Sequence, residues 1–180
     1  YLFNPDHDLA LANFDPNYMP SANVRQLASD LALLPAWYAK PDDSVWAASA
    51  FNQAFLDNMK SDFPDLPSLC TATDIILFPS PWGWNPAVAN RLSRSGISQE
   101  NLPSKDQLLL IREYSHRKFA ARLLPKLLFN HAFCGASSYL TDINLVRRFV
   151  EEHDKCILKA PLSGSGKGLN WCKGVFTYHI

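Results

Sequence analysis

Along the first hundred residues, short apolar runs alternate with longer segments in which apolar residues recur at helical spacing. The apolar runs that predict strands are residues 1–3, 45–48 and 74–78. The repeats that predict helices are residues 24–34, 51–59 and 86–95, the last of which begins with a proline. Strands that alternate with helices predict an α/β fold, here a small doubly wound domain with a mostly parallel sheet over residues 1–100.

Two of the predicted helices carry apolar stripes that we expect to face the core. The stripes are Leu27, Leu31 and Leu34 in the first helix and Phe51, Phe55 and Met59 in the second. Residues three and four apart share one face of a helix, so each stripe forms a continuous apolar surface. We interpret both stripes as surfaces that pack in the core rather than as parts of a functional site.

The pattern changes over residues 101–180, where we expect a second segment that begins with helices. Apolar spacing predicts helices from Ser104 and from Ser115, with Pro125 limiting the second of them. A short strand is expected at 137–140 and a further helix over 143–152. The following stretch, 156–178, predicts a strand, a glycine-rich loop and a second strand.

Charge and hydropathy exclude several classes of partner. Basic and acidic residues are balanced at 17 each, so the chain has no overall charge that would favour nucleic acid. No apolar run approaches the length of a membrane span, and the first residues lack the pattern of a signal peptide. We therefore expect a cytoplasmic protein with no membrane partner. Both ends lie within strand-like apolar runs, which indicates a fragment or an incomplete chain.

The four cysteines are far apart and lack the spacing of a zinc site or a redox pair. We expect them to be reduced and mostly buried. A bridge between Cys156 and Cys172 across the predicted hairpin is conceivable, although a cytosolic setting argues against it.

The glycine-rich loop is the strongest candidate for chemistry. It consists of Ser163, Gly164, Ser165, Gly166, Lys167 and Gly168. Glycines let backbone N–H groups approach an anion closely, and the hydroxyls and ammonium add further donors. The loop therefore predicts a phosphate-binding site, against the alternative of a flexible surface turn.

Spacing separates three kinds of phosphate loop. A Walker A loop is excluded because Pro161 and Gly168 occupy the positions that require glycine and a hydroxyl residue. A dinucleotide fingerprint is excluded because the glycine spacing differs and a strand pattern follows instead of a helix. The remaining arrangement is a hairpin tip that covers phosphates. Lys159, within an apolar strand, would then need a nearby negative partner to offset desolvation.

Lys159 and the loop 163–168 resemble the ATP-grasp superfamily, and residues 1–100 resemble its pre-ATP-grasp domain by architecture. The resemblance implies that Lys159 contacts the α- and β-phosphates of ATP and that the loop covers the triphosphate. Lys118, in a helix upstream, matches a second phosphate-binding lysine, with Arg117 as the adjacent alternative. His116 and Arg117 stand where an acidic residue often precedes that lysine. Residues 101–180 would then form a helical linker and the start of an ATP-grasp α+β subdomain.

The implied reaction is an ATP- and Mg²⁺-dependent ligation of a small carboxylate to an amine or a thiol through an acylphosphate. The Mg²⁺ ligands belong to a second subdomain outside this chain, so the chain alone is expected to be inactive. No catalytic residue is assigned, and the oligomeric state, including a homodimer, stays open. The alternatives are a non-catalytic interaction module and a P-loop-like kinase or NTPase.

Residues after the predicted strands of the first domain are candidates for the substrate side. They are Asp6, His7, Trp82 and Trp84. Loops at the carboxyl ends of strands in open α/β sheets commonly bind ligands. For Asp6 and His7 the alternative is a turn with a side-chain cap. For Trp82 and Trp84 the alternative, which we favour, is that the two rings pack their loop onto the sheet.

Overall fold

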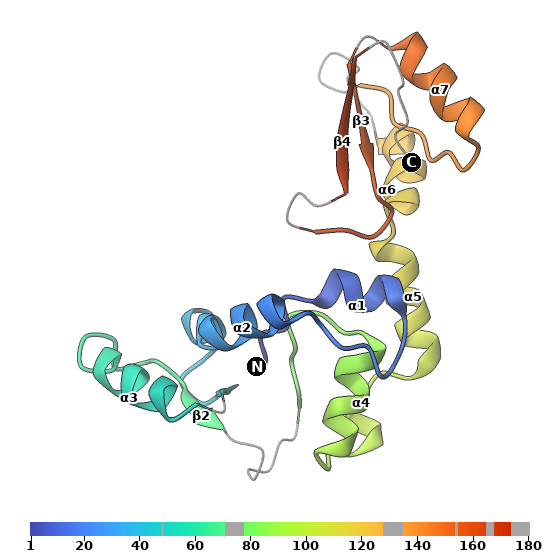
Figure 1. The fold of residues 1–180 in the computed structure, drawn as a ribbon. Coiled ribbons are helices and arrows are strands. Elements are labelled where there is room, and N and C mark those ends of the chain that lie inside the picture. The colour runs from blue at the N-terminus through green and yellow to red at the C-terminus, as the bar shows by residue number, and fades with distance from the viewer. Residues whose placement is uncertain (48, 71–77, 128–134, 154, 165–167, 174–180) are drawn as a thin grey trace. The chain divides into compact units, whose positions relative to one another are not determined.

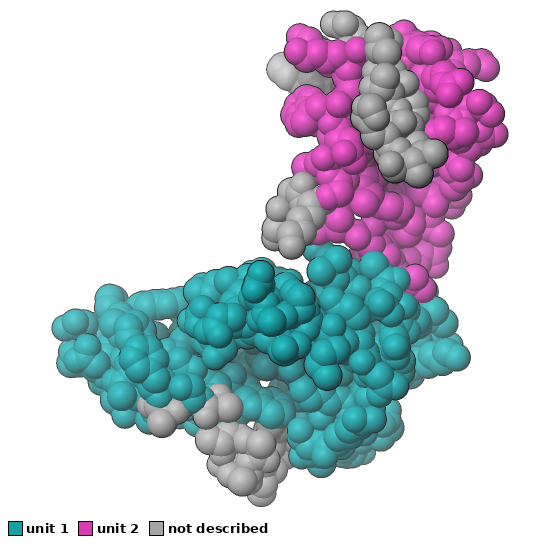
Figure 2. All heavy atoms as spheres, viewed as in Figure 1, with its two compact units in different colours: residues 1–111 teal, residues 112–180 magenta. Residues whose placement is uncertain are grey.

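The computed structural model describes residues 1–47, 49–70, 78–127, 135–153, 155–164 and 168–173. These residues form a mixture of helices and short sheets, in agreement with the predicted α/β class (Figure 1). The chain divides into two compact units, Tyr1–Ile111 and Arg112–Ile180 (Figure 2).

The elements of the first unit are α1 (His7–Asn13), α2 (Ala22–Asp30), a 3₁₀ turn η1 (Leu34–Trp37), β1 (Ser44–Trp46), α3 (Ala50–Met59), β2 (Ser68–Cys70), α4 (Pro86–Arg94) and η2 (Gln99–Asn101). Helix α5 (Lys105–Ser115) crosses the boundary. The elements of the second unit are α6 (Arg117–Leu127), α7 (Ile143–Glu152), β3 (Lys155–Lys159) and β4 (Leu169–Lys173).

In the first unit, Tyr1 and Leu2 extend the pairing of the small sheet from β1 to residues 80–82. Strands β1 and β2 pair in parallel, with Val45 opposite Leu69. Tyr1 exchanges two backbone hydrogen bonds with β1. Leu2 donates to the carbonyl of Ser80, accepts from the N–H of Trp82 and forms a parallel bridge with the residue between them. The chain start therefore lies between β1 and residues 80–82.

The expected strands of the first unit are only partly present. The strand predicted at 45–48 is found at Ser44–Trp46, and that at 1–3 is reduced to the bridge at Leu2. Residues 74–77 lie outside the described residues, and Phe78, expected in a buried strand, is 83% exposed.

The core of the first unit is made by two small clusters. One contains Ala36, Val45 and Leu56, and the other contains Val88, Leu92, Ile97 and Leu102. Leu56 and the polar Asn52, four residues apart, are the buried side of α3. The second cluster is the buried side of α4 together with the residues that follow it.

Both apolar stripes expected in the core were wrongly placed. Leu27, Leu31 and Leu34 are 45%, 43% and 38% exposed, and Phe51 and Phe55 are 76% and 46% exposed. The described strands β1 and β2 are only three residues long, so they offer little surface for a wide stripe to cover. Periodicity identified α3 within one residue of its bounds, whereas α2 ends at Asp30, four residues before the predicted end, and Leu34 belongs to η1. The buried side of both helices was predicted incorrectly.

Helix α4 follows the local signals in its sequence. Asn85 is the N-cap, and its side-chain oxygen accepts a hydrogen bond from the N–H of Val88 at 3.0 Å. Pro86 occupies the first helical position, where its missing N–H costs nothing. The helix predicted at 86–95 is confirmed.

In the described part of the second unit, helices α6 and α7 lie beside an antiparallel hairpin (Figure 1). Strands β3 and β4 pair with Lys159 opposite Leu169, so both predicted strands are confirmed, the second of them as far as Lys173. Residues 165–167 and 174–178 of the prediction lie outside the described residues. Helix α7 begins after Asp142, whose carboxylate accepts from the N–H of Asn144 at 2.7 Å, as expected for a cap. The strand expected at 137–140 is absent, because these described residues have no regular structure.

Candidate functional site

The glycine-rich loop is closed at its base by one short backbone contact. Ala160 N–H donates to the carbonyl oxygen of Gly168 at 2.7 Å. Gly168 has a φ of 68°, and a Cβ added there would lie 2.6 Å from the Cβ of Ala160. Only glycine satisfies both the left-handed backbone and the close approach. The predicted ligands Ser165, Gly166 and Lys167 lie outside the described residues.

Arg117 fastens the start of α6 to this loop. Its Nε donates to the carbonyl of Ala160 at 2.9 Å, and its Nη2 donates to the carbonyl of Ser163 at 2.7 Å and to the Ser163 hydroxyl at 3.3 Å. Its backbone N–H donates to Pro161 at 3.0 Å. The rigid guanidinium fork reaches two carbonyls that a single ammonium could not hold in the same way.

Arg117 and Lys118, the two candidates for the upstream phosphate contact, have different surroundings. Arg117 holds the base of the loop, while Lys118 follows it in the first turn of α6 with a half-buried side chain. No local pattern indicates that Arg117 contacts the loop backbone, since its partners lie 43 and 46 residues further along the chain.

His116 ends the turn before α6 and caps the helix. Its Nδ1 accepts the backbone N–H of Lys118 at 3.0 Å, so the ring proton of the neutral imidazole is on Nε2. Burial, followed by the charges of Lys118, Arg112 and Arg122, lowers the pKa of His116. The ring also packs edge-on against Tyr139 at 5.3 Å. Cationic side chains therefore gather around the start of α6.

The two faces of the hairpin differ sharply. Residues that alternate with the buried Cys156 form an exposed outer face: Lys155, Ile157, Lys159, Leu169, Trp171 and Lys173. Trp171, opposite Ile157, is 75% exposed. The expectation that Lys159 is desolvated was wrong, because strand alternation places it on this outer face. Lysine and flat apolar side chains thus share one open surface.

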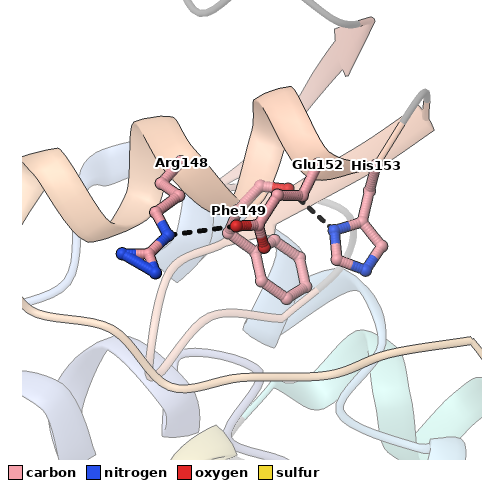
Figure 3. Close-up of polar contacts among 4 residues, drawn as sticks. All are labelled: Arg148, Phe149, Glu152 and His153. Atoms are coloured by element: carbon pink, nitrogen blue, oxygen red, sulfur yellow. Dashed lines mark hydrogen bonds and ion pairs between the residues drawn. The ribbon is translucent and has the colours of Figure 1, made fainter.

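A cavity of about 780 Å³ lies between the hairpin and the helices of the second unit. Its apolar lining includes Leu124 of α6 and Val146 and Phe149 of α7, and Arg117 also lines it. Residues from both faces of β3 contribute to the lining, Cys156 and Lys159 among them. At the end of α7, His153 stacks on Phe149 at 4.2 Å and its Nδ1 lies 2.8 Å from the Phe149 carbonyl (Figure 3). A carbonyl only accepts, so that Nδ1 carries the proton.

Asn4 joins the loop that follows residues 1–2 to the loop that follows residues 80–82. Its side-chain nitrogen donates to the carbonyl of Gly83 at 2.8 Å, and its side-chain oxygen accepts from the Gly83 N–H at 3.2 Å. The His7 ring packs so closely on Gly83 that an added Cβ would lie 2.3 Å from its Cγ. His7 therefore lies beside the segment that carries Trp82 and Trp84.

The four candidates in these loops have different surroundings. Burial lowers the pKa of His7, against the opposing effects of the Asp8 carboxylate, the Gly83 backbone and the Asp6 carboxylate. Its Nδ1 is buried and makes no hydrogen bond of good geometry within the described residues. Trp84 packs against the Val88 cluster, as expected for a plug. Trp82 is 56% exposed and contacts Phe3 edge-on at 5.6 Å, so it remains accessible.

Within the described residues, no group of three or more His, Cys, Asp or Glu side chains is placed to hold a metal ion. No helix in the described part of the chain is long and apolar enough to cross a membrane. No family model, curated protein or solved structure matches this chain.

Proposed function

We propose that this chain is part of an ATP-dependent ligase of the ATP-grasp superfamily, with the nucleotide bound on the outer face of the β3–β4 hairpin. A substrate carboxylate would attack the γ-phosphorus of ATP, with ADP as the leaving group. An amine or thiol would then attack the acylphosphate carbon and release phosphate. The chain would contribute position and positive charge rather than a covalent nucleophile.

The observation that carries the proposal is the position of Lys159. It is the last residue of β3, on the exposed face, immediately before the hydrogen bond that closes the loop. A phosphate held over Lys159 would lie next to the loop amides and to the hydroxyl of Ser163. Arg117, more than 40 residues earlier in the chain, stabilises the same loop by donating hydrogen bonds to the carbonyls of Ala160 and Ser163.

The rest of the outer face offers a surface for the base. Ile157 is two residues before Lys159 on the same face, about 7 Å along the strand, and Trp171 lies opposite it. Exposed aromatic and aliphatic side chains stack well on flat bases. Lys155 and Lys173, paired at the far end of the hairpin, give the face further positive charge.

The first unit would be the small doubly wound domain that precedes the nucleotide site. Its support is the order in which segments pair: β2 beside β1, β1 beside residues 1–2, and these beside residues 80–82. The loops that carry Asp6, His7, Trp82 and Trp84 follow residues 1–2 and residues 80–82, the neighbouring segments between which the connections diverge. Ligands of open α/β sheets bind at such positions, so we assign the carboxylate substrate to this side.

The P-loop alternative is disfavoured by the element that follows the glycine-rich loop. A P-loop leads into a helix whose N-terminus faces the phosphates, whereas this loop leads into β4. The interaction module remains as the alternative outcome, favoured by the exposure of Trp82.

Calorimetric titration of the chain with Mg²⁺–ATP tests the proposal. We expect Lys159→Ala to weaken binding roughly ten- to a hundredfold, as for the loss of a charge-assisted contact of about 1.5–3 kcal/mol. Lys155→Ala is the matched control, since Lys155 lies on the same strand and face, four residues from the loop side. It should weaken binding less than threefold, roughly the effect of a screened surface charge.

Two results would count against the assignment. Equal losses for the two lysine variants would indicate general attraction to a basic surface. Absence of binding by the folded chain would favour the interaction module over the nucleotide site.

A further inference from the structure

The antiparallel register of the hairpin places Cys156 directly opposite Cys172. Cys156 is buried at 7% exposure, Cys172 is half-buried, and both are free thiols. We propose that these two cysteines form a redox-active dithiol that closes to a disulfide by exchange with a small disulfide such as oxidised glutathione. This inference concerns the inner face of the hairpin and does not depend on the proposed nucleotide site.

The ladder has the geometry that such a bridge needs. Ala160 N–H bonds to Gly168, so these two residues form a hydrogen-bonded pair of the antiparallel ladder. Hydrogen-bonded pairs recur every second residue, which puts Cys156 and Cys172 in another such pair. Cα atoms in these pairs are about 5.5 Å apart, within the range of roughly 4.4–6.8 Å found across disulfides. Cβ atoms of facing residues are about 4.5–5.5 Å apart, whereas those of a disulfide are about 3.5–4.5 Å apart. The bridge therefore keeps the register and draws the two strands slightly together at this pair.

Neighbouring contacts give the two thiols different roles. The Cys156 thiol donates to the carbonyl of His153 at 3.5 Å, and His153 is held in turn by its ring hydrogen bond to Phe149 (Figure 3). Cys156 is thus kept at the inner face, where it lines the cavity. Cys172 is the more accessible thiol and is the one that meets a dissolved reagent first.

The exchange has two steps that balance. The Cys172 thiolate attacks one sulfur of oxidised glutathione, which forms a mixed disulfide and releases one glutathione thiolate. The Cys156 thiol loses its proton to solvent and attacks the Cys172 sulfur, which breaks the mixed disulfide and releases the second glutathione. Two protein thiols are oxidised to one disulfide, and one glutathione disulfide is reduced to two thiols that take up the two protons.

The bridge would fasten the hairpin without obstructing its outer face. Cys156 and Cys172 point away from the side that carries Lys159, Ile157 and Trp171, because alternate strand residues face opposite sides. The bond would join the strands on either side of the glycine-rich loop and restrict the unfolded chain. Oxidation should therefore stabilise the hairpin and leave the loop itself unmodified.

The test uses the full chain with Cys70→Ser and Cys134→Ser, so that only the two hairpin cysteines remain. After incubation with oxidised glutathione and alkylation, intact mass should show the loss of both free thiols with no glutathione retained. Peptide mapping should then recover a Cys156–Cys172 link. Addition of Cys156→Ser to the same background should leave Cys172 carrying one glutathione. The oxidised pair should also unfold at a higher temperature than the reduced pair.

Several results would overturn the proposal: two glutathiones retained on the folded pair, no reaction at either thiol, or a link between two chains. Wild-type chain provides a second measurement should the double serine variant fail to fold. There, the Cys156–Cys172 link should dominate over links to Cys70 or Cys134 in buffer and lose that dominance in urea. Equal yields of all links in buffer would contradict a dithiol set by the fold.

Discussion

The carbonyl oxygen of Ala160 accepts a hydrogen bond from Arg117 Nε at 2.9 Å, while the N–H of the same Ala160 closes the glycine-rich loop onto Gly168. The first residue of α6 and the residue that follows β3 are therefore held together. Any ligand bound by the loop would act on a backbone whose base is already fixed by the protein.

Replacement of Arg117 should loosen the loop. Arg117→Ala removes hydrogen bonds from a charged donor and should cost about 1.5–3 kcal/mol of stability in the second unit. Hydrogen exchange at the Ala160 amide is the measurement, because it reports the loop base directly. Arg148→Ala is the control: Arg148 forms an exposed ion pair with Glu152 at 3.0 Å (Figure 3), worth about 0.5 kcal/mol. Equal protection in both variants would contradict the anchoring role.

Alanine substitutions at Gly168 and Gly96, which both have a positive φ, distinguish the cost of backbone strain from the cost of a steric clash. Gly168→Ala introduces a Cβ 2.6 Å from the Ala160 Cβ, whereas Gly96→Ala, at a φ of 89°, meets no atom within 4 Å. Both should lose about 1–2 kcal/mol from the left-handed conformation. Only Gly168→Ala should lose more, and it should accelerate hydrogen exchange at Ala160. Similar unfolding free energies for the two variants would show that the loop relaxes around the new methyl group.

Loss of the Asn4 side chain should destabilise the first unit. Asn4 is 3% exposed and satisfies both the N–H and the carbonyl of Gly83. Asn4→Ala leaves these groups without their partner and should cost about 1–3 kcal/mol in denaturant unfolding. Asn90→Ala, which removes an exposed bond to the Pro16 carbonyl, should change stability by no more than about 0.5 kcal/mol. Comparable effects would mean that water replaces Asn4.

Stability should fall as the pH is lowered below about 6.5, the ordinary pKa of histidine. Burial and neighbouring cations lower the folded-state pKa of His116, so the unfolded chain binds more protons between the two values. Stability is therefore present above the unfolded pKa and is lost as pH falls towards the folded one. Protonation also removes the Nδ1 acceptor that caps α6.

His116→Asn separates this contribution from that of His7, whose pKa is lowered in the same direction. Asparagine caps helices without titrating in this range. Helix α6 in the variant should keep its amide protection from pH 7 to pH 5, roughly the interval in which histidine gains its charge. A variant that loses protection at α6 as wild type does would exclude His116 as the source.

Sequence alone determined the elements that depend on local chemistry. The helix that begins at Pro86, the helix over 143–152 and the two strands that flank the glycine-rich loop were all recognisable because their signals span only a few residues. The candidate phosphate loop and Lys159 belong to this group, since the spacing of the glycines and lysines along the chain is sufficient to exclude the other phosphate loops.

Tertiary structure decided what depends on contacts between distant residues. Arg117 finds its loop partners 43 and 46 residues away, and Asn4 finds Gly83 at a separation of 79. Periodicity also could not choose between the exposed Phe51 side and the buried Leu56 side of α3. The side of a helix that is buried, and the carbonyl that an arginine reaches, depend on the packing of the whole unit rather than on nearby sequence.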